Sequence, residues 1–98
     1  MSEFRRYVAV VEKNQHGRIF AHIPDLPGVT AGGNTVDDTL RILADIADDY
    51  VLDLANANLE VPGATAWEEF KSDPDVNEFL RCIVPVRIPP KVSRTVKI

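Results

Sequence analysis

The sequence predicts an α+β fold in which a small sheet packs against one long helix. Two runs rich in β-branched and aromatic residues, Tyr7–Val11 and Arg18–Ile23, flank a polar stretch that ends in glycine. The segment from Val36 to about Ala57 then has apolar residues at helical spacing, and a last apolar run follows at Leu80–Ile88. Because the first strands precede the helices, we expect the helices on one face of the sheet.

The first two runs predict a β-hairpin. The polar stretch between them, Glu12–Gly17, is typical of a hairpin connection. In the second run Ile19, Ala21 and Ile23 share one face, because side chains alternate along a strand. A short third strand at Val29–Ala31 would complete a meander.

The long helix is predicted to be amphipathic. Its apolar positions recur at three- and four-residue spacing over about six turns. They are Val36, Leu40, Leu43, Ala47, Tyr50, Val51 and Leu54. Thr35 occupies the N-cap position, and Asp38 three residues later completes a capping box.

The connection between hairpin and helix is rigid. Pro24 and Pro27 fix φ and lack backbone donors, so the chain must leave the sheet there. Asp25 lies between them, where we expect an Asx-type turn with nearby N–H groups.

Four shorter signals follow the long helix. Pro62–Gly63 breaks the chain, and a capping box opening at Thr65 predicts a short helix through Phe70. Asp73–Pro74 repeats the cap pattern. Pro85 interrupts the last run, which indicates an edge strand or a strand end.

The size and composition fit one small globular domain. The chain has 98 residues, of which 45% are hydrophobic, and it has no run approaching the roughly 20 apolar residues of a membrane span. The N-terminus has no apolar segment typical of a secretory signal. The single cysteine, Cys82, lies in an apolar run, where a buried thiol packs as a small hydrophobe. We therefore expect a cytoplasmic protein without membrane association.

Charge is divided unevenly along the chain. Fifteen acidic and six basic residues precede Arg81, whereas five basic residues and no acidic ones follow from Arg81 on. We expect one domain over residues 1–90 and a basic tail over residues 91–98. This tail either presents a second surface or folds onto the acidic helix.

Acidic residues gather on the outer face of the predicted helix. They include Asp45, Asp48, Asp49 and Asp53, with Arg41 nearly alone as compensation. Such a face is either a solvated surface or a contact for a basic partner.

The sequence contains no recognisable reactive constellation. His16 lies in the predicted turn and His22 on a strand, without the spacing of a metal site. Asp25 and an acid of the long helix could approach each other as a metal-binding pair, but turn bonding is the plainer role of Asp25. We expect no catalytic residue, no metal and no cofactor.

Two stretches carry a family resemblance. The motif PDLPG at Pro24–Gly28, followed by Gly33–Thr35 and an acidic helix start, resembles the HicB-like antitoxin family. The stretch Ala64–Val86 is similar to the capped helix, Asp-Pro turn and last strand of that family. The resemblance covers most of Tyr7–Val86 and implies a partial RNase-H-like fold.

The resemblance also implies a function. HicB antitoxins neutralise HicA, a small basic toxin that cleaves mRNA, by covering its active site and RNA surface. The predicted contacts for a HicA-like toxin are Asp25, Leu26, Asp45, Asp48, Asp49 and Asp53.

Self-association and DNA binding are further expectations. A homo-dimer or tetramer is expected, with its interface at Trp67, Val84 and Val86. Family members usually carry a C-terminal DNA-binding module that represses their own operon. Ser93–Ile98 resembles its first strand, so DNA is a partner only if the native protein continues into such a module.

A second hypothesis is a stand-alone domain that binds a small ligand or serves in oligomerisation, with no toxin. A neighbouring gene for a short basic protein with one key histidine would distinguish the two.

Overall fold

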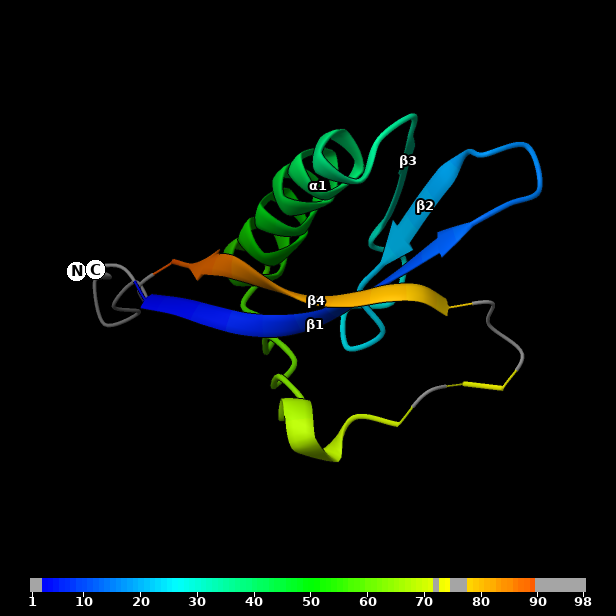
Figure 1. Ribbon diagram of the computed structural model, residues 1–98. Coiled ribbons are helices and arrows are strands. Elements are labelled where there is room, and N and C mark those ends of the chain that lie inside the picture. The colour runs from blue at the N-terminus through cyan, green and yellow to red at the C-terminus, as the bar shows by residue number, and fades with distance from the viewer. Residues whose placement is uncertain (1–2, 72, 75–77, 90–98) are drawn as a thin grey trace, which may run out of the picture.

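The computed structural model describes residues 3–71, 73–74 and 78–89. These form, in order, β1 (Glu3–Lys13), β2 (Ile19–His22), β3 (Thr30–Gly33), α1 (Val36–Asn56), the 3₁₀ helix η1 (Trp67–Glu69) and β4 (Glu78–Ile88). The strands make one antiparallel sheet in the order β3-β2-β1-β4, and α1 lies on one face of it (Figure 1). The predicted α+β class is confirmed.

The turn of the β1–β2 hairpin is held by hydrogen bonds between the Asn14 side chain and the backbone N–H groups of the turn. The Asn14 side chain accepts hydrogen bonds from the N–H groups of His16 and Arg18, each at 2.9 Å. Gly17 has a φ of 81°, which glycine adopts without a Cβ clash. The predicted hairpin is confirmed. The predicted third strand at Val29–Ala31 is present as β3, which pairs with β2 and extends to Gly33.

The N-terminus of α1 lies where the sequence predicts it. Thr35 is the N-cap, and its hydroxyl accepts the N–H of Asp38 at 3.1 Å. The Asp38 carboxylate, which a capping box would direct to the Thr35 N–H, instead bonds to Arg41 at 2.6 Å. α1 ends at Asn56, one residue short of the predicted boundary.

The main core lies between α1 and the sheet. Tyr7, Ala9 and Val11 alternate along β1 and are fully buried. Leu43 and Ala47 of α1 join the same cluster, because a spacing of four residues places them on one helix face.

The other face of the sheet is also apolar, and the segment after α1 covers it. Val8 and Val10 of β1 are 0% and 4% exposed, although they alternate with the residues that face α1. Arg81 of β4 lies opposite Val10 of β1, so both side chains are on this face. The Arg81 guanidinium lies over the rings of Trp67 and Phe70, at 5.7 and 4.9 Å from their centres. Hence η1 lies on the face opposite α1 (Figure 1), which corrects the predicted arrangement of all helices on one face.

Two side chains of β1 hold the segment that crosses from α1 to η1. The Arg5 guanidinium donates to the carbonyls of Val61 and Pro62, at 3.3 and 3.1 Å. The Tyr7 hydroxyl donates to the Pro62 carbonyl at 2.5 Å. Burial raises the pKa of this hydroxyl above its ordinary value of 10.0, so it remains a donor at neutral pH.

The predicted capping box at Thr65 is wrong. The N-cap of η1 is Ala66, which has no side-chain hydrogen bond, and η1 is a single 3₁₀ turn. Thr65 uses both its N–H and its hydroxyl to bond to Asp25 instead. A contact distant in the sequence therefore replaces the local one.

β4 lies at an edge of the sheet and pairs with β1 over its length. This confirms the edge position indicated by Pro85. Residues 72, 75–77 and 91–98 lie outside the described residues, and with them most of the expected Asp73–Pro74 helix and the expected tail strand. No helix in the described part of the chain is long and apolar enough to cross a membrane.

Candidate partner-binding surfaces

Three of the predicted contact residues form a row along α1. Asp45, Asp49 and Asp53 follow one another at intervals of four residues, which places them nearly one above another on a helix. All three are exposed. Within residues 3–71, 73–74 and 78–89, no lysine or arginine forms an ion pair with them. We call these three residues the acidic row.

Asp48 lies to one side of the acidic row, toward β4. Its carboxylate accepts a hydrogen bond from the backbone N–H of Arg87, at 3.1 Å. The Asp48 carboxylate therefore already has a hydrogen-bond partner within the same chain.

The outer face of α1 is also partly apolar. Ile42 and Leu52 are 41% and 45% exposed and lie close to the acidic row. Both occur outside the apolar positions that define the inner helix face, so the sequence contained the signal for this surface. Protein interfaces commonly combine an apolar centre with a polar rim.

The Pro24–Gly28 loop is arranged differently from the prediction. Leu26 is 0% exposed and belongs to the main core, so its side chain is not available to a partner. Asp25 is half-buried, and its two carboxylate oxygens accept the Thr65 N–H at 2.7 Å and the Thr65 hydroxyl at 2.9 Å. The expected local Asx turn at Asp25 is replaced by this long-range pair.

The three predicted interface residues have different environments. Val84 and Val86 are 4% and 0% exposed and pack in the core beneath α1, so their side chains contact the rest of the same chain. Trp67 is 45% exposed. Of these three, only Trp67 has an exposed side chain.

Arg81 organises the surface around Trp67. Its guanidinium bonds to the Glu78 carboxylate at 3.1 Å and lies over the Trp67 and Phe70 rings. This cluster could not be predicted from the sequence, because it depends on η1 and β4 lying together on the same side of the sheet.

The cysteine and the two histidines lie apart from one another, in different parts of the fold. Cys82 is half-buried beside the main core, and burial raises the pKa of its thiol. His16 is exposed in the hairpin turn, and the His22 ring lies 3.7 Å from the Glu12 carboxylate. Among the described residues no group of three or more histidine, cysteine or acidic side chains could hold a metal ion.

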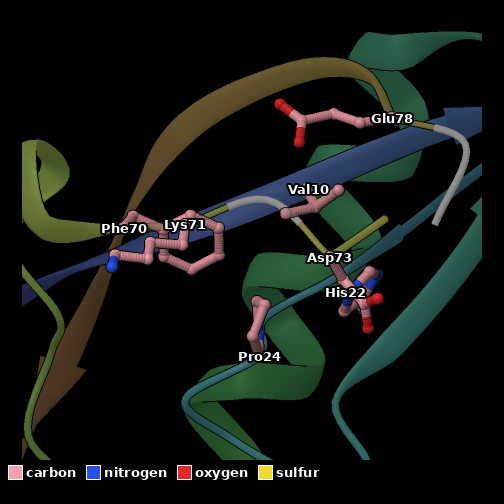
Figure 2. Close-up of a pocket in the computed structure, with 7 residues that line it drawn as sticks. All are labelled: Val10, His22, Pro24, Phe70, Lys71, Asp73 and Glu78. Carbon is pink, nitrogen blue, oxygen red and sulfur yellow. The ribbon is translucent and has the colours of Figure 1, made fainter. Parts of the chain in front are cut away.

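A small cavity lies on the sheet face opposite α1. Figure 2 shows its lining: Val10, His22, Pro24, Phe70, Lys71, Asp73 and Glu78. Its volume is about 100 Å³, whereas pockets for drug-sized ligands typically have volumes of about 300–1,000 Å³. The cavity is therefore too small for most organic ligands.

A larger, open groove of about 540 Å³ runs beside β2 and β3. Phe20 lines it with its ring packed over Gly32, where a Cβ atom would lie 3.3 Å from the ring carbons. Glu12, Arg18 and His22 add polar groups. This groove could not be predicted from the sequence, because it depends on the register of β2 and β3.

These features define a small α+β domain with an acidic, partly apolar helix face. The model of the family described as the HicB-like antitoxin of bacterial toxin–antitoxin systems matches residues 7–98. The chain therefore belongs to this family. No curated protein matches the sequence.

Solved structures with the same fold include other antitoxins. The Burkholderia pseudomallei antitoxin HicB has a TM-score of 0.72 at 20% identity, covering 95% of this chain and 74% of that one. A chain of the HicA3–HicB3 toxin–antitoxin complex has a TM-score of 0.61 at 22% identity, covering 87% and 99%. A chain of a toxin–antitoxin complex from Streptococcus pneumoniae has a TM-score of 0.68 at 16% identity, covering 98% and 82%.

Proposed function

We propose that this antitoxin neutralises a small basic, mRNA-cleaving toxin of the HicA type by binding it and covering its active site. Membership of the HicB-like family supports this role, as does the fold shared with chains from two toxin–antitoxin complexes. In this action the antitoxin makes and breaks no covalent bond.

The observation that carries the proposal is the outer face of α1. The acidic row of Asp45, Asp49 and Asp53 is exposed, and Ile42 and Leu52 supply apolar area beside it. Negative charge attracts a basic protein and orients it before contact, and buried apolar area then slows its dissociation. We assign the toxin contact to this face, in place of the side chains of Leu26 and Asp48.

Self-association and operon repression are secondary parts of the proposal. Trp67, with its exposed ring, is the candidate contact between two copies in a dimer or tetramer. DNA binding belongs to a C-terminal module, if the native protein contains one.

The proposal is tested by displacement of RNA from a catalytically inactive variant of the partner toxin. Labelled RNA is bound to that toxin, and the chain is added while fluorescence anisotropy is recorded. We expect stoichiometric release of the RNA. Retention of the RNA at saturating antitoxin would contradict the proposal that the antitoxin covers the RNA surface.

A further inference from the structure

The outer side of β4, which we call the β4 edge, is a potential site of unwanted pairing. β4 has eleven residues and lies at one end of the sheet order. Its exposed side chains include Phe79, Leu80 and Ile83, which are 54%, 40% and 39% exposed. A long, apolar edge strand invites another chain to add a strand, and every copy of this protein presents the same edge.

Asp48 blocks one backbone position on this edge. The Arg87 N–H donates to the Asp48 carboxylate at 3.1 Å, across 39 residues of sequence. Because a backbone N–H points in one direction only, this donor is directed away from β1 and toward the β4 edge. An incoming strand would have to displace the carboxylate to reach it.

Pro85 blocks the adjacent position. In an antiparallel strand the N–H groups of alternate residues point to the same side, so position 85 faces the same edge as position 87. Proline has no N–H, and β4 tolerates it because position 85 faces the open edge and would not bond to β1. Hence two consecutive outward positions, 85 and 87, offer no donor to an incoming strand.

A bulge modifies the other end of β4. Val11 of β1 pairs with Leu80, and Glu12 pairs with Glu78, so Phe79 is an extra residue in β4. Bulges bend and twist a strand, which makes the edge a poorer template for pairing.

We infer that Asp48 and Pro85 prevent a second copy of this chain from adding a strand to the β4 edge. Asp48 acts through its hydrogen bond to the Arg87 N–H. Asp45 and Asp49 lie on the same helix and are exposed like Asp48, but they do not make this bond. The inference goes beyond the proposed function, because it requires no toxin.

The test compares three single variants by sedimentation velocity over a range of protein concentrations. Asp48→Ala removes the acceptor, whereas Asp48→Asn removes the charge but keeps an oxygen that accepts the Arg87 N–H. Asp45→Ala removes the same charge from the same helix and serves as the control. We expect Asp48→Ala alone to form larger species, with an apparent mass about twice that of the parent chain at high concentration.

A rescue variant separates edge pairing from general instability. Arg87→Pro removes the outward donor itself, so the double variant Asp48→Ala/Arg87→Pro should return to the parent mass. Equal masses for the parent chain and Asp48→Ala would overturn the inference. Equal association of Asp48→Ala with either Asp48→Asn or Asp45→Ala would also overturn it, because lost charge would then explain the effect.

Amide hydrogen exchange in the parent chain tests the same bond without any substitution. The Arg87 amide should exchange at least about tenfold more slowly than expected for an open strand edge. Exchange at the rate of an unprotected amide would overturn the role of Asp48.

Discussion

Asp25 and Thr65 are joined by two hydrogen bonds, although forty residues separate them in the sequence. The bonds measure 2.7 and 2.9 Å and connect the Pro24–Gly28 loop to the segment that leads into η1. This segment covers the sheet face opposite α1, where Val8 and Val10 are buried. Asp25 thus helps to hold the covering segment in place.

Replacing Asp25 by alanine should destabilise the fold by about 2 kcal/mol, because a half-buried N–H and hydroxyl lose a charged acceptor. Chemical denaturation measures the loss, and limited proteolysis should cut the segment around Thr65 faster. Asp25→Asn keeps one acceptor and should lose less. Weaker toxin binding by Asp25→Ala with unchanged stability would instead indicate direct toxin contact.

Gly33 packs against the start of α1, where no side chain fits. A Cβ atom there would lie 2.7 Å from the Thr39 hydroxyl oxygen, which itself bonds to the Thr35 carbonyl. Gly33→Ala should therefore destabilise the fold by about 1–3 kcal/mol through overpacking. Gly63→Ala is the matched control, since no atom lies within 4 Å of its added Cβ. Equal thermal stability of the two variants would contradict this prediction.

Tyr7 should make stability depend on alkaline pH. Burial raises the pKa of its hydroxyl in the folded chain, so folding favours the protonated form. The resulting stabilisation is fully present below the unfolded pKa of about 10 and decreases as the pH rises above it. Tyr7→Phe should lose about 1 kcal/mol at neutral pH, through loss of the bond to Pro62.

The deficit of Tyr7→Phe relative to the parent chain should shrink above pH of about 10, because phenylalanine does not titrate. Urea unfolding of both proteins at neutral and alkaline pH measures this difference. A deficit that stays constant or grows with pH would show that the hydroxyl does not contribute through its proton.

The sequence predicted the elements whose signals are local. Thr35 marked the start of α1, and the alternation in the second run fixed β2. Pro85 indicated an edge strand or a strand end, because proline cannot donate to a neighbouring strand, and β4 is an edge strand.

The sequence did not reveal features that depend on distant contacts. A capping pattern at Thr65 is satisfied equally well by Asp25, and a sequence does not indicate which acceptor is nearer in space. The acidic residues of α1 look alike in the sequence, yet Asp48 meets Arg87 only because β4 returns beside the helix. Val84 and Val86 were predicted to lie at an interface, because an apolar edge strand commonly pairs with a second chain. The sheet register instead places both side chains in the core beneath α1.

Reversing the charge of the acidic row should slow toxin association. The double variant Asp45→Lys/Asp49→Lys should reduce the association rate about tenfold at low salt, with a smaller effect at high salt. Stopped-flow fluorescence measures these rates. Glu60→Lys/Glu68→Lys makes the same charge change at exposed sites away from the row and should have a much smaller effect. Equal slowing by both pairs would assign the effect to net charge alone.

The central claim is that this chain acts by binding and covering a basic toxin. The most direct measurement is cleavage of mRNA by the partner toxin at increasing ratios of antitoxin to toxin. We expect cleavage to fall to the background level at a fixed stoichiometric ratio, and the antitoxin alone to leave the RNA intact. Undiminished cleavage in excess antitoxin, or RNA hydrolysis by the antitoxin alone with divalent ions, would contradict the claim.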